Sequence, residues 1–265
     1  MADPAMATTI AIFTALALPL TLLVLLRPSL VVRFLLAPLL PDVIFRGNGR
    51  QHTLAITIDD GPSPANGMDS PGSGHNGSMA LLALLRELKV ATTLFVISGH
   101  LERADPAYLG QALADGHCIG HHMDTDNVSA RLSPTHFRQT FNQAAADLHG
   151  AAAPRSLPLH WFRPGGGWIR PSMLRYVAQR GYRLVLGSIF PWDTFHPPVS
   201  WMCWFVLSNA HPGGILVLHD RPDTLPATME LLRQVVPVLR QRGYRFVTLD
   251  DLLTTSDTAE TCHSS

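Results

Sequence analysis

Two adjacent carboxylates, Asp59 and Asp60, follow a run of apolar and β-branched residues and precede a Gly61-Pro62 turn. Neighbouring acids at the end of a strand repel each other, so the pair costs stability unless a metal cation or an arginine lies beside it. The alternative is a solvated turn, where Asp and Gly are common. This pair is the first candidate for catalytic or metal-binding chemistry in the chain.

Three later stretches carry residue types that suit the same chemistry. His122 and Asp126 are four residues apart, and on a helical turn both side chains would share one face and could bind a divalent ion together. The alternative is a polar loop that happens to be rich in His and Asp. Arg163 is followed closely by three glycines, a weak motif by itself that could be only a solvated loop. His219 ends an all-apolar strand, where it is either a satisfied core histidine or a titrating group.

The elements that must position these residues alternate along the chain between strand and helix. The chain has 265 residues, which is long enough to form one barrel with a large core. We therefore expect an α/β fold, a distorted, TIM-like parallel (β/α)7 barrel, in which the chemical residues lie at the carboxyl ends of strands. The expected strands are 53–59, 91–97, 117–121, 160–163, 182–188, 214–219 and 244–249. The expected helices are 79–89, 105–115, 133–149, 170–181, 200–210 and 225–242.

Taken in order, the motifs resemble those of the polysaccharide deacetylases, also called the NodB-homology family or carbohydrate esterase family 4, which includes chitin deacetylases. The matching stretches are Thr57 to Gly61, His122 to Asp126, Arg163 to Gly167, Asp193, and Val217 to His219. The resemblance extends from about residue 48 to 255. Each motif alone is weak, but their order and spacing together are specific.

The resemblance implies a division of labour among the catalytic residues. Asp59 is expected to be the general base that takes a proton from water, with Arg163 placed to pair with its carboxylate. His219 is expected to be the general acid for the departing amine. Asp193 would raise the pKa of His219 toward the working pH.

The metal site implied by the resemblance consists of Asp60, His122 and Asp126, which would hold one divalent ion: zinc, manganese or cobalt. Asp126 departs from the family pattern, which has a second histidine at this position. A carboxylate makes the donor set harder and more anionic, so we expect a preference for manganese or cobalt over zinc and a bound water that ionises less readily.

Substrate and oxyanion contacts are expected from Gly166, Trp168, Trp192 and Val217. The backbone N–H of Gly166 would stabilise the oxyanion, and the two tryptophans could stack on sugar rings. Gly166 stands where the family usually has an aromatic residue, which suggests a more open groove. We assign a further tryptophan, Trp161, to the core.

The function that follows is a metal-dependent hydrolase that removes N-acetyl groups from an amino-sugar polymer or glycan, such as chitin, chitooligosaccharides or peptidoglycan. Two alternatives stay open: a catalytically weak or inactive carbohydrate-binding member of the same fold, and a hydrolase of a non-sugar amide. A formal net charge of zero argues against a nucleic-acid partner. The oligomeric state is not predictable from the sequence.

The N-terminus is expected to be a separate unit, because Pro4 to Leu26 contains no charged residue and is long enough to span a bilayer. A cleaved signal peptide is the alternative. We expect an anchor and juxtamembrane segment over 1–46, the catalytic domain over 47–255 with its first strand near Thr53, and a disordered tail over 256–265. The protein would be membrane-anchored, in the secretory pathway or at the cell surface, although the cues for its orientation conflict.

Overall fold

The computed structural model describes residues 21–49, 51–63, 77–153 and 155–257. Its centre is an eight-stranded, all-parallel sheet in the order β1-β6-β5-β4-β3-β2-β7, with β8 paired to β2. The strands are β1 Val43–Ile44, β2 Thr53–Gly61, β3 Thr93–Val96, β4 Cys118–His121, β5 Trp161–Phe162, β6 Arg183–Val185, β7 Gly214–His219 and β8 Arg245–Val247. All seven strands expected from the sequence are present, and β1 is an addition that precedes the first expected strand.

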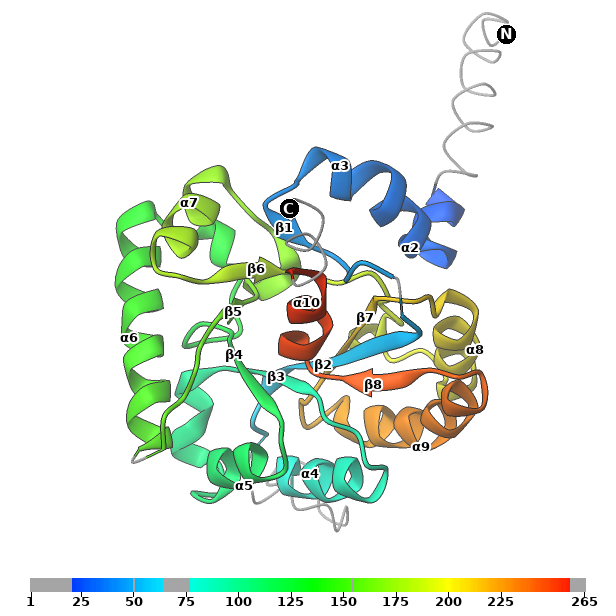
Figure 1. The fold of residues 1–265 in the computed structure, drawn as a ribbon. Coiled ribbons are helices and arrows are strands. Elements are labelled where there is room, and N and C mark those ends of the chain that lie inside the picture. Colours follow the sequence, from blue (N-terminus) through cyan, green and yellow to red (C-terminus); the bar gives the residue numbers. More distant parts are fainter. Residues whose placement is uncertain (1–20, 50, 64–76, 154, 258–265) are drawn as a thin grey trace, which may run out of the picture.

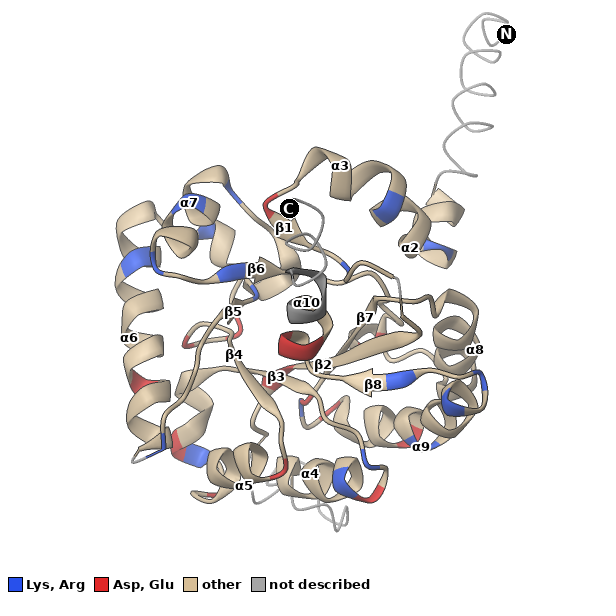
Figure 2. Ribbon diagram, in the orientation of Figure 1, with Lys and Arg blue, Asp and Glu red and all other residues tan. Residues whose placement is uncertain are grey.

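Helices follow the strands and surround the curled sheet (Figure 1). Basic and acidic residues are both spread over these outer elements (Figure 2). The α-helices are α2 Pro28–Val31, α3 Ala37–Leu39, α4 Gly77–Glu87, α5 Tyr108–Ala114, α6 Pro134–Ala152, α7 Pro171–Gln179, α8 Val199–Asn209, α9 Leu225–Gln241 and α10 Leu249–Asp257. A π-helical turn, η1 Val32–Leu36, joins α2 to α3, and short 3₁₀ segments are η2 Ser98–Arg103, η3 Ser129–Arg131, η4 Gly165–Gly167 and η5 Asp193–Phe195. The six helices expected from periodicity correspond to α4 through α9.

The sheet curls toward a ring (Figure 1), and the segment after β6 joins the two ends of the ring. Beyond β6 the chain runs beside β7, where Ile189 and Leu216 form an isolated parallel bridge. The N–H of Val217 donates to the carbonyl of Ile189 over 3.0 Å. The structure therefore confirms the expected α/β class and parallel sheet: the strands form a curled sheet surrounded by helices, consistent with the expected barrel.

One end of the ring is filled by α10, which lies across its centre in Figure 1. Leu249, Leu252 and Leu253 of this helix form a buried cluster with apolar residues of β2, β3, β5, β6 and β7. Trp161 belongs to this cluster, as expected, and its indole N–H donates to Asp250 over 2.6 Å. The helix reaches Asp257, two residues into the predicted tail, of which 258–265 lie outside the described residues.

The segment before β2 packs on the same core. Strand β1 pairs in parallel with β6, and Val32, Val43 and Phe45 are buried in the main apolar cluster. The sequence placed the first strand near Thr53 because a two-residue strand has too little periodicity to stand out. Within the described residues, no helix has the length and apolar character needed to cross a bilayer. Residues 4–20 of the predicted anchor lie outside this part of the chain.

Candidate active site

Asp59 and Asp60 lie at the end of β2, just before its last residue, and the register of its pairing with β3 shifts between Ile58 and Gly61. In a regular strand, adjacent side chains point to opposite faces, and a bulge re-aims one of them. Asp60 adopts a left-handed backbone conformation with φ of 67°, which is uncommon for a residue other than glycine. Both carboxylates are buried. Strain at this point is typical of a segment that positions a functional side chain.

Arg163, which follows β5, holds the first of these acids. Its Nη1 lies 2.6 Å from Asp59 Oδ1 and 2.8 Å from the Thr57 hydroxyl, and its Nε donates to the carbonyl of Val185 over 3.0 Å. The guanidinium also lies 4.1 Å from the ring centroid of Phe95. Burial lowers the pKa of Arg163, and the charge of Asp59 opposes that shift. The expected Asp59–Arg163 pair is therefore formed inside the sheet.

His122 meets the second acid. Its Nε2 lies 3.1 Å from Asp60 Oδ1, and its Nδ1 lies 2.7 Å from the carbonyl oxygen of Arg163. Burial disfavours the charge on each partner, but their contact prevails: it lowers the pKa of Asp60 to about 2 and raises the pKa of His122. Arg163 thus positions Asp59 with its side chain and His122 with its main chain.

The neighbouring histidine has a structural environment instead. His121 is buried, its ring stacks on Phe141 with centroids 4.2 Å apart, and its Nε2 lies 2.9 Å from the Phe141 carbonyl. Its Nδ1 accepts from the N–H of Met123 over 3.1 Å, and burial lowers its pKa to about 4. A neutral imidazole with both nitrogens in use is a core residue.

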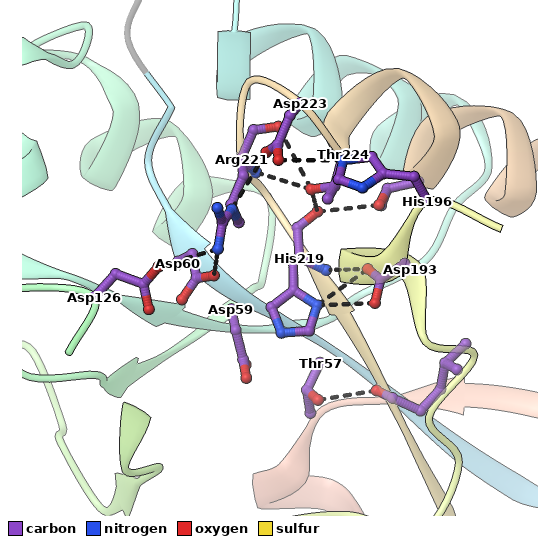
Figure 3. Close-up of polar contacts among 12 residues, drawn as sticks. Thr57, Asp59, Asp60, Asp126, Asp193, His196, His219, Arg221, Asp223 and Thr224 are labelled. Atoms are coloured by element: carbon purple, nitrogen blue, oxygen red, sulfur yellow. Dashed lines mark hydrogen bonds and ion pairs between the residues drawn. The ribbon is translucent and has the colours of Figure 1, made fainter. Parts of the chain in front are cut away.

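His219 ends β7 and is oriented by Asp193 (Figure 3). Its Nδ1 lies 3.0 Å from Asp193 Oδ1, and its backbone N–H donates to Oδ2 over 2.9 Å. Burial would lower the pKa of His219, but the bond to Asp193 and the charges of Asp193, Asp59 and Asp60 raise it to about 9. With Nδ1 occupied, Nε2 is the nitrogen left for a ligand or a proton transfer.

Asp126 does not join the pair of Asp60 and His122. The chain from 122 to 128 is bent rather than helical, so the one-face geometry expected for His122 and Asp126 is wrong. The backbone there is held by Ser98, whose N–H donates to the carbonyl of Met123 over 3.0 Å. The Asp126 carboxylate is partly exposed and lies 3.1 Å from the guanidinium of Arg221.

The residues implied as metal ligands therefore fit a metal ion only in part. Asp60 and His122 converge and are of donor types that bind divalent ions. Nη1 of Arg221, which pairs with Asp126, also lies 3.9 Å from Asp60 Oδ2. Within residues 21–49, 51–63, 77–153 and 155–257, no three His, Cys, Asp or Glu side chains are grouped so that they could hold a metal ion.

The residues expected to contact substrate differ in how far they are exposed to solvent. Gly166 has φ of 68° in η4, and Trp168 beside it is 68% exposed. Trp192 also adopts a left-handed conformation and donates its indole N–H to the carbonyl of Leu25 over 3.1 Å. Val217 is buried in β7, close to Gly187. Of these four residues, Trp168 is the one with an exposed aromatic side chain.

Two residues of this region were missed by the sequence analysis, Asp220 and Arg221. Asp220 is buried, with its Oδ2 hydrogen-bonded to the Ser78 hydroxyl and its carbonyl accepting from the Ser63 hydroxyl over 2.9 Å. Asp220 and Arg221 line a cavity of about 450 Å³ together with Asp60 and Asp126. Their position directly after His219 could have identified them, because charged residues that follow β7 must lie at the carboxyl edge of the sheet, beside the other site residues.

Comparison with known proteins assigns the chain to a family. The model for "Polysaccharide deacetylase" matches residues 46–185, more than half of the chain. The chain belongs to the polysaccharide deacetylase family. It is 31% identical to a peptidoglycan-N-acetylglucosamine deacetylase of Bacillus cereus, over 76% of this chain and 87% of the relative. It is also 31% identical to a chitooligosaccharide deacetylase of Azorhizobium caulinodans, over 73% and 91%. The predicted family is confirmed, and with it the class of enzyme, a polysaccharide N-deacetylase.

Solved structures of carbohydrate esterase family 4 and of a peptidoglycan deacetylase share the fold. A peptidoglycan N-acetylglucosamine deacetylase superposes with a TM-score of 0.71 at 23% identity, covering 80% of this chain and 93% of that one. A carbohydrate esterase family 4 pseudoenzyme from Bacillus anthracis superposes with a TM-score of 0.66 at 18% identity, covering 79% and 68%. At these identities the likeness supports the fold alone.

Proposed function

We propose that the protein hydrolyses N-acetyl groups on an amino-sugar polymer or glycan, with Asp59 as general base and His219 as general acid. The observation that carries the proposal is the pairing of these two side chains at one sheet edge. Asp59 and His219 are register partners on β2 and β7, and each has its own buried counter-charge, Arg163 and Asp193. A base and an acid with separate partners suit the two proton transfers of amide hydrolysis.

The environments of the two residues fit these roles. The Arg163 guanidinium lies 2.6 Å from Asp59 and holds one carboxylate oxygen, so the orientation of the proposed base is fixed. The bond from Nδ1 of His219 to Asp193 leaves the second ring proton on Nε2. A pKa of about 9 keeps His219 protonated at neutral pH, as a donor to a leaving amine must be.

The expected metal dependence stays a prediction in this proposal. Asp60 and His122 provide two suitable donors, whereas Asp126 is engaged by Arg221. The proton transfers are therefore assigned to Asp59 and His219 alone. The oxyanion contact from the N–H of Gly166 also stays a prediction, as does stacking of a sugar ring on Trp168.

The substrate class is proposed from the named relatives, a peptidoglycan deacetylase and a chitooligosaccharide deacetylase. The cavity of about 450 Å³ beside Asp60 has His100 and Arg103 in its lining, which can hydrogen-bond sugar hydroxyls. We therefore propose N-acetylglucosamine units of peptidoglycan or chitooligosaccharides as substrates.

A second candidate function, a carbohydrate-binding protein with weak or absent catalysis, is favoured by one observation. Arg221 bridges Asp126 and Asp60, where a cation-binding site was expected. An enzyme and a binding protein differ in turnover but not necessarily in affinity for the polymer.

Acetate release distinguishes these candidates. We would measure acetate from chitotetraose, from peptidoglycan and from a non-sugar N-acetyl amide, with and without added Mn²⁺, Co²⁺ or Zn²⁺. The expected result is release from a sugar substrate that falls roughly 10²–10⁴-fold in Asp59→Asn and in His219→Ala. Asp115→Asn, which changes an acid paired with Arg86 outside the cavity and the Asp59–His219 pair, is the control and should keep full activity. Polymer binding without release would favour the binding protein, and release only from the simple amide would favour a hydrolase of a non-sugar amide.

A further inference from the structure

The cluster of acids around Arg221 contains its own cation. The Arg221 guanidinium makes three contacts with carboxylates: Nη1 lies 3.1 Å from Asp126 Oδ2 and 3.9 Å from Asp60 Oδ2, and Nε lies 3.2 Å from Asp223 Oδ1. Figure 3 shows the side chain extending from the loop after β7 toward Asp60 and Asp126. Asp60, Asp126 and Asp223 therefore share a positive charge supplied by the chain itself.

We propose that Arg221 is a tethered cation that competes with a divalent metal ion for Asp60 and Asp126, and so sets the metal affinity of the site. The proposal deepens the proposed function, because it concerns access of an ion to the same site, but it can be tested by binding alone. A divalent ion and a guanidinium cannot occupy the space between the same carboxylates, since like charges at such distances repel strongly. The ion can bind all three expected ligands only after Arg221 has left.

The structure holds the main chain of Arg221 firmly and leaves its side chain able to move. The Arg221 N–H donates to the Thr224 hydroxyl over 3.3 Å, and its carbonyl accepts from the N–H groups of Thr224 and Leu225 over 3.1 and 2.8 Å. The side chain is 38% exposed. A guanidinium on a fixed turn can therefore swing into solvent while α9 keeps its position.

The partners of Arg221 differ in how easily they release it. Asp126 and Asp223 have side chains that are 44% and 47% exposed, and exposed ion pairs are weak. Asp60 is buried, and its contact with Arg221 is the longest of the three. An incoming ion would bind the buried carboxylate of Asp60, and breaking the exposed ion pairs of Arg221 would cost little free energy. Competition of this kind lowers metal affinity without abolishing it.

The test is metal binding to the full chain, measured by isothermal titration calorimetry with Mn²⁺ or Zn²⁺ alone and by the electron paramagnetic resonance signal of free Mn²⁺. Arg221→Gln should tighten binding by roughly three- to tenfold, and Arg221→Lys should have a smaller effect. Arg103→Gln is the matched control, because it removes the same charge from the lining of the same cavity and leaves the three carboxylates and Arg221 in place.

Circular dichroism would confirm that each variant is folded. Equal affinities of Arg221→Gln and Arg103→Gln would overturn the proposal, because the effect would then be one of net charge. Weaker binding in Arg221→Gln, or no binding to any variant at millimolar ion, would overturn it as well. Tightened metal binding in Arg221→Gln, together with no acetate release from the native protein or from any variant, would count against the proposed function and leave the role of Arg221 intact.

Discussion

Asp59 and His219 are register partners on β2 and β7, and the N–H of the residue after His219 donates to the carbonyl of Asp59 over 2.8 Å. The backbone ladder thus fixes two titratable side chains beside each other, although 160 residues separate them in the chain. Because both residues lie on paired strands, the backbone hydrogen bonds hold this acid and base more precisely than loops would.

We expect Asp59→Asn to lose both activity and stability. Asn cannot accept the water proton, so turnover should fall by roughly 10²–10⁴-fold. The buried Arg163 loses the partner that lies 2.6 Å away, and breaking a buried pair costs about 3–5 kcal/mol. Urea unfolding at pH 7 measures the second effect.

The double variant Asp59→Asn/Arg163→Met serves as its control. Removal of both charges should recover part of the lost stability but none of the activity. A single variant as stable as the native protein would mean that Asp59 and Arg163 are not coupled in solution.

Asp193→Asn is expected to shift the pH dependence of turnover to lower pH. His219 must be protonated to act as an acid, so activity should fall as pH rises through its pKa of about 9. Loss of the Asp193 charge removes the main support of the imidazolium, and the alkaline limb of kcat/KM should move down by about one to two pH units. An unchanged alkaline limb, with Asp115→Asn as the reference, would show that His219 does not govern it.

Asp220 should make the protein less stable as pH rises from 4 to 7. Burial raises the pKa of Asp220 to about 6, against the opposing bonds from Ser78 and Ser63. A folded-state pKa above the unfolded value means that the folded state favours the protonated acid, so this contribution is kept below pH 4 and lost through pH 6. The shift corresponds to about 3 kcal/mol.

Asp220→Asn removes that titration. Urea unfolding of both proteins between pH 4.5 and 7.5 gives the difference in unfolding free energy, which should change in favour of the variant as pH rises. A constant difference across this range would show that Asp220 stays ionised, or stays protonated, throughout.

Truncation should show whether the segment before β2 belongs to the folded domain. The sequence predicted that the first strand begins near Thr53, whereas β1 and the residues before it pack on the core. A chain starting at residue 46 lacks β1 and the buried Val32, Val43 and Phe45, and should lose on the order of 5 kcal/mol relative to a chain starting at residue 21. Thermal unfolding of the two truncated proteins makes the comparison. Equal midpoints would mean that β1 contributes nothing to the core.

The sequence by itself determined the repeated β-α units, the helices α4 to α9 and the set of residues at the carboxyl edge of the sheet. These features are encoded locally, in apolar runs and helical periodicity. Parallel strands place their carboxyl ends together, so Asp59, His122, Arg163 and His219 were expected to meet before their contacts were known.

Only the tertiary structure decided which side chains at this edge of the sheet contact each other. Asp126 pairs with Arg221, 95 residues away in the chain, instead of with His122, four residues away. The segment 122–128 is bent by long-range backbone bonds, and local spacing carries no information about such bonds. The bulge at Asp60, the pairing of β1 and the filling of the ring by α10 likewise depend on register and packing between distant segments, which form only when the whole sheet has assembled.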